Sequence, residues 1–327
     1  MMRLNGLGGC VVGVLLCASG TEAAVAPASV AEAVKKMDKA AIRALVQKHA
    51  DVNVPEPDGS TALHWAAYTN DFEIADLLIK AGADPNIADN DAGMGPLYAA
   101  MDMHRLAIGH GRGTPLPTGL LTAVDVARSL LEHGAVVDAQ LKKPIMQRTH
   151  TFGDGTLGAG TTPLLRAAKS GDIEMVRLLL AAGADPKHTL ENGTTAFMLA
   201  AGLGWRNGSP IAPSYDQGPE SEAIETLELL LGLGLDVRAA TATGDTALHG
   251  AVGRPSETLV KFLLEHGADP LAANARKQTP LSMAETRGTP AMAQILRNAA
   301  PTAAASATAP APAAIAAAGS GSDSTAK

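Results

Sequence analysis

The chain has little cysteine, few aromatic residues and no excess of positive charge. Its two cysteines, Cys10 and Cys17, both lie near the N-terminus. The rest of the chain therefore cannot hold a disulfide framework, a zinc site of clustered cysteines, a c-type haem attachment or a cysteine nucleophile. Lys and Arg number 26 against 33 Asp and Glu, and the net charge of −7 leaves no general basic surface for nucleic acid.

The apolar content points to helices. Aromatic residues make up only 3% of the chain, although 46% of it is hydrophobic. Most of the apolar side chains are therefore those of Ala, Leu and Val, which suit close-packed helices better than a β-sandwich. A length of 327 residues corresponds to about two ordinary domains or to one elongated array.

The N-terminus has the layout of a secretory signal peptide. One basic residue, Arg3, precedes an apolar run over 7–18, and small residues follow it. The run is shorter than the roughly 20 residues that a membrane-spanning helix needs. We therefore expect a signal peptide over 1–23 and an exported, periplasmic or extracellular protein with no stable membrane span after cleavage. A retained membrane anchor and lipidation at a cysteine are the alternatives.

The C-terminal segment, 299–327, differs in composition from the rest of the chain. It consists of Ala, Pro, Ser, Thr and Gly with almost no charge. It has no periodic apolar face and too little bulky apolar surface to offset the loss of conformational entropy on ordering. We expect a disordered tail there.

Between these two ends a motif recurs. The residues at 61–67, Thr-Ala-Leu-His-Trp-Ala-Ala, return at 246–251 as Thr-Ala-Leu-His-Gly-Ala. Weaker copies begin at 95, 162, 195 and 279, and the first five copies are each followed by a Leu-rich amphipathic segment. A Thr suits the start of a helix, and a Gly suits the left-handed position just past its end. The glycines expected in that position are Gly82, Gly134, Gly183, Gly234 and Gly267.

These residues resemble the ankyrin repeat, because many positions agree at a spacing near 33 residues. The resemblance implies an all-α solenoid of helix-turn-helix units with short β-turn fingers, stabilised by stacking of neighbouring units. It also implies structural roles for Thr61, His64, Thr246 and His249, in which each His ring bonds the backbone around the turn. The domain spans about 28–298, with caps at 29–53 and 274–298 and five repeats at about 57–89, 90–139, 157–189, 190–240 and 241–272.

The spacing of the glycines reveals three insertions. Within a unit the turn Gly and the helix-ending Gly are 23 residues apart in three units and 41 apart in the second and fourth. Those two units therefore carry 18 extra residues each, at about 103–120 and 204–221, between inner and outer helix. A third insertion of 16 residues lies near 141–156, in the finger between the second and third units. Insertions in repeat proteins form loops that are often functional, although duplication of a two-repeat block would also explain the equal lengths.

The insertions hold most of the residues that we expect to bind a partner. Those at 103–120 and 141–156 together hold five Lys and Arg residues against one Asp and predict a local positive region on an acidic chain. The insertion at 204–221 contains Trp, Arg and Tyr, the residue types enriched at binding hot spots. Two further candidates lie on inner helices, at positions that resemble the variable concave-face positions of the family. The full set is Tyr68, Arg112, Lys142, Lys143, Arg148, Lys169, Trp205, Arg206 and Tyr215.

No motif predicts chemistry. His104 and His110 lie in one insertion, but a spacing of six matches no common helical pair of metal ligands. Residues 153–158 match the pattern G-x-G-x-x-G of dinucleotide-binding loops, but no strand is expected before them. We therefore predict no metal, no cofactor and no catalytic residue, and a monomeric, non-enzymatic module that binds another protein. The alternatives are a small-ligand or enzymatic pocket formed by the insertions at 103–120 and 204–221, an effector acting on host proteins, and an accessory subunit of an envelope redox enzyme.

Overall fold

The computed structural model describes residues 29–69, 71–104, 122–144, 156–205 and 219–307, with backbone alone at 102–104 and 301–307. These residues form α-helices joined by turns, which confirms the all-α class predicted from the repeat. Two isolated β-bridges, Thr189–Thr195 and Ala240–Thr246, lie in the fingers. The helices are α1 (Val30–Lys35), α2 (Lys39–Gln47), α3 (Ala62–Tyr68), α4 (Phe72–Lys80), α5 (Pro96–His104), α6 (Ala123–Glu132), α7 (Pro163–Ser170), α8 (Ile173–Ala181), α9 (Ala196–Ala200), α10 (Glu220–Gly232), α11 (Ala247–Gly253), α12 (Glu257–Glu265), α13 (Pro280–Arg287) and α14 (Pro290–Ala307).

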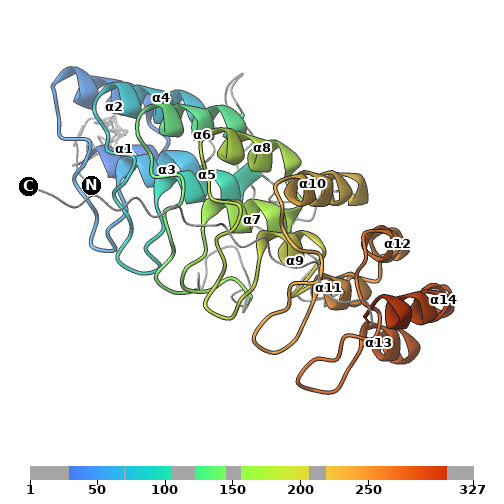
Figure 1. Cartoon of the computed structure of the whole chain (residues 1–327). Helices are drawn as coiled ribbons and strands as arrows, with labels where there is room; N and C mark the ends of the chain where they lie inside the picture. The colour runs from blue at the N-terminus through green and yellow to red at the C-terminus, as the bar shows by residue number, and fades with distance from the viewer. Residues whose placement is uncertain (1–28, 70, 105–121, 145–155, 206–218, 308–327) are drawn as a thin grey trace, which may run out of the picture.

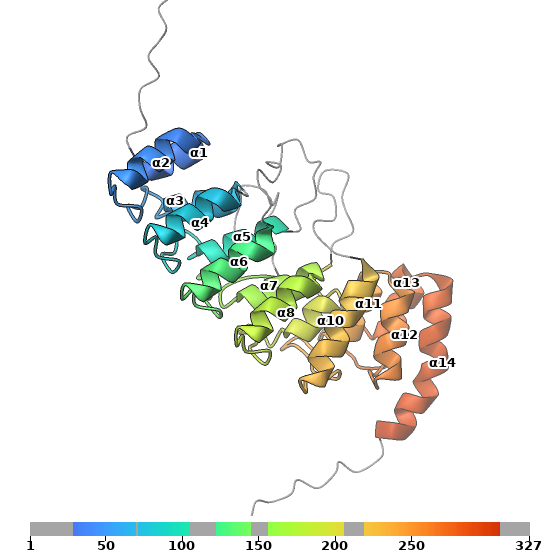
Figure 2. The ribbon, with the colours of Figure 1, turned by 90° about the horizontal axis from the view of Figure 1, so that it is seen from above.

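The helices form two parallel layers. Each odd-numbered helix contacts the next odd-numbered helix, and each even-numbered helix contacts the next even-numbered one. The two helices of each pair, from α1–α2 to α13–α14, also contact each other. Figure 1 shows the odd-numbered inner layer beside the even-numbered outer layer, with the fingers projecting past the inner one. In Figure 2 the pairs follow one another in chain order, so the array is a solenoid in which each unit packs on its neighbours.

The ends of the helices follow from local sequence. The inner helices α3, α7, α9, α11 and α13 each begin after a Thr whose extended backbone forms the N-cap. The outer helices α4 and α8 begin after Asp71 and Asp172, whose carboxylates accept a backbone N–H of the first turn. Past the outer helices, the chain turns at glycines with φ between 83° and 92°, a region that L side chains rarely adopt. These are Gly82, Gly134, Gly183, Gly234 and Gly267.

The core lies between the two layers. Leu63 on the inner helix α3 and Leu78 on the outer helix α4 are fully buried, and Leu248 and Leu263 occupy the corresponding places on α11 and α12. Small side chains such as Ala67 lie between adjacent units and are also fully buried. The combination of large Leu between the layers and small Ala between the units allows the close stacking on which a repeat array depends.

Asparagine side chains join the turns that follow successive outer helices. The amide of Asn53 donates to the carbonyl of Gly82 at 2.9 Å and accepts the backbone N–H of Asp84 at 2.7 Å. Asn86, in the next unit, donates to the carbonyl of Gly134 at 2.9 Å. Each Asn side chain bonds backbone groups of the following turn that the helix itself leaves without a partner.

The structure differs from the sequence-based expectation at the C-terminus. Helix α14 runs to Ala307, so residues 299–307, which we expected at the start of the disordered tail, are helical. Ala has the highest helix propensity, and a helix already packed on α12 and α13 can propagate into an Ala-rich segment without further packing.

The insertions fall where the glycine spacing places them. Described chain flanks them between α5 and α6, between α6 and α7, and between α9 and α10. Residues 105–121, 145–155 and 206–218, like the expected signal peptide at 1–23, lie outside the described residues. Within the described ranges, none of the helices is both long and apolar enough to cross a membrane.

Candidate functional site

The inner helix α3 begins with a Thr–His pair that links the first unit to the second. The His64 Nδ1 accepts the backbone N–H of Thr61 at 3.0 Å and lies 2.9 Å from the Thr61 hydroxyl. On its other side the Nε2–H donates to the carbonyl of Met94 in the following finger, at 2.9 Å. Burial lowers the pKa of the His64 ring, which favours the neutral form that this bonding requires.

The fifth unit repeats this arrangement. The His249 Nδ1 accepts the backbone N–H of Thr246 at 3.1 Å, and its Nε2–H donates to the carbonyl of Gln278 at 3.1 Å. Both rings are almost fully buried. The two histidines therefore join consecutive units and face no ligand site.

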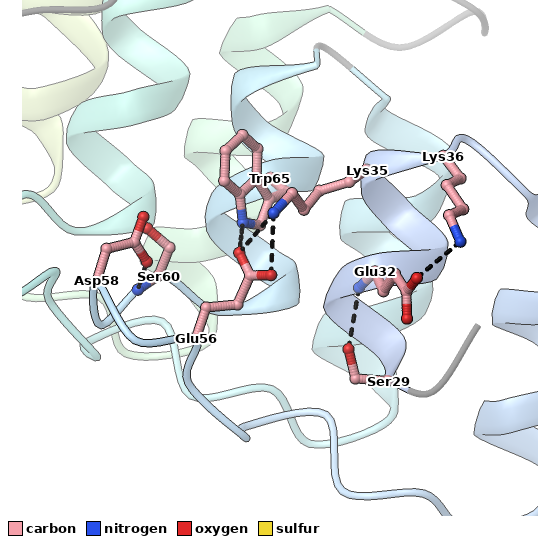
Figure 3. A network of polar contacts seen from close by, with 8 residues as sticks. All are labelled: Ser29, Glu32, Lys35, Lys36, Glu56, Asp58, Ser60 and Trp65. Atoms are coloured by element: carbon pink, nitrogen blue, oxygen red, sulfur yellow. Dashed lines mark hydrogen bonds and ion pairs between the residues drawn. The ribbon is translucent and has the colours of Figure 1, made fainter.

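A cluster of polar and aromatic side chains lies on the first unit, where α1, α3 and the first finger meet. The Trp65 indole N–H donates to Glu56 at 2.7 Å. The Lys35 ammonium forms an ion pair with the same carboxylate at 3.0 Å and lies 4.7 Å from the centroid of the Trp65 ring. Figure 3 shows the Glu56 carboxylate bonded to both the Trp65 indole and the Lys35 ammonium. The Trp65 indole is therefore oriented by its hydrogen bond to Glu56 and by its cation–π contact with Lys35.

Tyr68 adjoins this cluster. It lies one turn beyond Trp65 on α3, and the two rings meet edge to face with their centroids 6.0 Å apart and an interplanar angle of 85°. Both side chains are half-buried. We call Lys35, Glu56, Trp65 and Tyr68 the aromatic corner. Of these four, the sequence indicated Tyr68 as a binding residue, whereas Lys35 and Glu56 went unnoticed because only the fold brings them to α3.

Lys169 stands in a different environment from the one expected. It occupies the same place on α7 that Tyr68 occupies on α3, but only 8% of it is exposed. Arg166, one turn earlier and at the place of Trp65, is equally buried. The assignment of Lys169 as a partner-binding residue stays a prediction, and its burial shows that the position in the repeat does not by itself decide exposure.

Trp205, at the start of the fourth unit's insertion, packs on the next unit. The Arg254 guanidinium lies 5.1 Å from the centroid of its ring. Arg254 is 9% exposed, and burial lowers the pKa of its guanidinium, an effect that the nearby Glu220 carboxylate opposes. The indole is half-buried. The sequence singled out Trp205 but not Arg254, which comes from the unit that follows.

The finger lysines lie against the preceding finger. The backbone N–H of Lys142 donates to the carbonyl of Ala92 at 2.7 Å, and the Lys143 ammonium forms an ion pair with Asp91. Both lysines are exposed. The remaining predicted binding residues lie outside the described residues; they are Arg112, Arg148, Arg206 and Tyr215.

No metal-binding constellation is found in the described part of the chain, where no three His, Cys, Asp or Glu side chains gather in a way that could hold a metal ion. Five described histidine rings bond backbone carbonyls, those of His64, His133, His188, His249 and His266; for example, His188 bonds the carbonyl of Gly160 at 2.8 Å.

Two models of repeat families match this chain. A family model described as "Ankyrin repeats (3 copies)" matches residues 30–110 and 220–305, and one described as "Ankyrin repeats (many copies)" matches 164–210. The mouse B-cell lymphoma 3 protein homolog is 29% identical over 76% of this chain and 53% of its own length. Mouse NF-kappa-B inhibitor delta is 27% identical over 73% of this chain and 66% of its own length. The chain thus spans between half and two thirds of these relatives.

Solved structures agree on the fold. The human ASB11 ankyrin repeat domain superposes with a TM-score of 0.56 at 20% identity, over 83% of this chain and 96% of that domain. The ankyrin repeat domain of Bcl-3 gives a TM-score of 0.53 at 24% identity, over 82% of this chain and 97% of that one. Since the family models together match more than half of the residues, and the stacked helix pairs have the same architecture, the chain belongs to the ankyrin-repeat family.

Proposed function

We propose that this protein is a non-enzymatic scaffold that binds another protein through its inner face and its inserted loops. One ankyrin-repeat relative, NF-kappa-B inhibitor delta, is named as an inhibitor of NF-kappa-B, which supports a role in binding another protein. Repeat stacking gives a rigid, extended surface suited to the same role.

The aromatic corner carries this proposal. Trp and Tyr are among the residue types most enriched at binding hot spots, and here both are half-buried on one helix. Glu56 and Lys35 already hold the Trp65 ring in place. The Trp65 side chain would therefore lose little conformational entropy when a partner binds to it, and this favours affinity.

Export is part of the proposal. The basic residue and short apolar run at the N-terminus support a secretory signal, and the nearly cysteine-free chain is compatible with an oxidising compartment. Fractionation of the producing cell tests this directly. Recovery of a shortened chain in the periplasm or medium would support export, and recovery of the full-length chain in the cytosol would contradict it.

Capture of a partner from the producer's envelope fraction tests the binding function. Four baits are compared: the intact mature protein, the Trp65→Ala/Tyr68→Ala variant, a form with both 18-residue insertions shortened to tight turns, and a Lys80→Ala control. Lys80 is an exposed residue of the outer helix α4, so its loss should leave capture unchanged. Circular dichroism first establishes that every bait is folded.

The outcome assigns the binding surface. Loss of one captured protein with the Trp65→Ala/Tyr68→Ala bait, but not with the Lys80→Ala bait, would place the site at the aromatic corner. Loss only with the shortened bait would place it in the insertions. If no bait captures a protein, the scaffold proposal fails, and the small-ligand alternative at 103–120 and 204–221 becomes the stronger reading.

A further inference from the structure

Helix α11 has a Gly where the equivalent helix α3 has a Trp. Both helices begin Thr-Ala-Leu-His, and the next residue is Trp65 in α3 but Gly250 in α11. A Cβ at Gly250 would lie 2.5 Å from the backbone nitrogen of Leu203 and 2.9 Å from the carbonyl carbon of Gly202. The chain that leaves α9 therefore crosses the inner face of α11, where α3 places its own indole.

Two further glycines permit this crossing. Gly202 has a φ of 103°, and a Cβ there would lie 2.9 Å from the Cβ of Arg254. Gly204 has a φ of 77°, and a Cβ there would collide with Thr156, at the end of the finger insertion. Glycine is thus required at both positions for conformation and for space. The base of the fourth unit's insertion is packed against the neighbouring chain on two sides.

Arg254 connects the two ends of that insertion. Its guanidinium lies 5.1 Å from the centroid of the Trp205 ring, near the start of the insertion. Glu220, which opens α10 where the chain returns, also interacts electrostatically with Arg254. A planar guanidinium can stack on an indole and attract a carboxylate at the same time. One residue of the fifth unit therefore faces both the exit and the return of the fourth unit's loop.

We propose that Arg254 is a positioning residue that, with the space left by Gly250, anchors the base of the fourth unit's insertion across the inner helix of the fifth unit. The anchor holds Trp205 on the inner face of the fifth unit and so makes this side chain part of the binding surface. That role rests on the proposed function, whereas the anchoring itself does not.

The fluorescence of Trp205 tests the anchor without any partner. The chain has two Trp residues, so Trp65→Phe leaves Trp205 as the only Trp, which can be excited at wavelengths that Tyr does not absorb. In this background Arg254→Ala and Gly250→Ala are compared with matched controls, Arg287→Ala and Gly253→Ala. Arg287 is exposed on α13, and a Cβ at Gly253 meets nothing within 4 Å.

We expect Arg254→Ala and Gly250→Ala each to shift Trp205 emission to the red and to increase its quenching by acrylamide, because the indole loses its packing. The two controls should leave both quantities unchanged. Arg254→Lys keeps the charge near Glu220 but loses the planar stack, so it should fall between wild type and Arg254→Ala. Unchanged emission and quenching in both test variants, with helical circular dichroism retained, would overturn the proposal.

Partner capture separates this inference from the proposed function. If Arg254→Ala exposes Trp205 and also reduces capture, the anchor serves binding. If it exposes Trp205 while capture stays complete, the anchor exists but its binding role is refuted. If no form of the protein captures a partner while Trp205 responds as expected, the scaffold function fails and the anchor stands.

Discussion

The first and fifth units use one framework to build two different inner faces. Helices α3 and α11 share the Thr–His start, the bond from the His ring to the next finger and a fully buried Leu. In α3 the inner face carries Trp65, held by side chains of α1 and the first finger. In α11 the same place is Gly250, and backbone from the fourth unit fills it. The framework is therefore common to both units, while the inner face depends on what each neighbour supplies.

The third unit adds a third variant. On α7 the equivalent positions are Arg166 and Lys169, and both are buried. A charged residue is buried only where other groups compensate its lost hydration. Equivalent positions on the inner helices therefore differ. Trp65 is a half-exposed aromatic side chain, Arg166 is a buried cation, and Gly250 is a glycine covered by the backbone of the fourth unit. The position in the repeat determines which way a side chain points. The neighbouring segments determine whether that side chain is accessible to solvent or to a partner.

The largest expected effect tests the shared framework. Leu63→Ala in the first unit and Leu248→Ala in the fifth should each lower the free energy of unfolding by about 2–5 kcal/mol, because each leaves a cavity between the two layers. The two losses should be similar, since both leucines are fully buried at the same place. Urea denaturation followed by circular dichroism measures them. A loss below about 1 kcal/mol in only one variant would show that the two cores are not equivalent.

A smaller effect, with a pH dependence, is expected at the Thr–His link. His64→Leu leaves the Thr61 N–H and the Met94 carbonyl without their partner and should cost about 1–3 kcal/mol at neutral pH. Burial lowers the pKa of the folded His64 ring below its ordinary value of 6.5. Between these two pKa values the unfolded chain binds more protons, so the stabilisation by His64 is complete above about pH 6.5 and is lost as the pH falls.

Urea denaturation at several pH values checks this sign. The difference in stability between wild type and His64→Leu should be largest at neutral pH and should shrink on acidification. His249→Leu serves as the comparison in the fifth unit, because it removes the same pair of bonds. A difference for His64→Leu that grows toward acid pH would contradict the assignment of a neutral ring.

The aromatic corner should contribute less to stability than either of these. Trp65→Phe removes the indole N–H that Glu56 accepts and weakens the contact with Lys35, for an expected cost of about 1 kcal/mol. A double-mutant cycle of Trp65→Leu with Lys35→Ala removes the aromatic face and measures its coupling to Lys35, which should be about 0.5–1 kcal/mol at this partly exposed site. Zero coupling would mean that the contact between Lys35 and the ring contributes nothing to stability.

The smallest effect should be a gain. Gly253→Ala adds a methyl group that meets nothing within 4 Å, at a helical position with no positive φ. It should therefore stabilise the protein by up to about 1 kcal/mol, because Gly is entropically unfavourable in a helix. Gly250→Ala, three residues earlier on the same helix, should show no such gain, since its methyl group meets backbone of Leu203. Thermal unfolding of both variants measures the contrast, and equal gains would mean that Gly250 is not in contact with the fourth unit.

The local sequence predicts the framework because the framework is built from local physics. Thr at the start of an inner helix, Gly past the end of an outer helix and Leu at helical spacing act within one unit. The same units stack by nearest-neighbour contacts, so recognising the period also indicates the array. The tail boundary at 299 was less well predicted, because whether an Ala-rich segment continues a helix depends on the packing of the residues before it.

The site was predictable only in part. Tyr68 could be selected from its position in the repeat, and Trp205 from its residue type in an insertion. Glu56 and Arg254 could not, because each acts on a residue from another helix or another unit. The one available signal for the anchor was Gly250, a glycine at the place that Trp65 occupies in the best-matching copy of the motif.

The sequence by itself determined the repeat, its helix ends, its core positions and the places where extra residues enter, since each follows from spacing and from interactions within about one unit. The tertiary structure alone decided which inner-face residues are reachable. It half-exposes Trp65 and Tyr68, buries Lys169 and stacks Trp205 on Arg254. The physical reason is that exposure depends on segments distant in the chain, which come together only when the units stack.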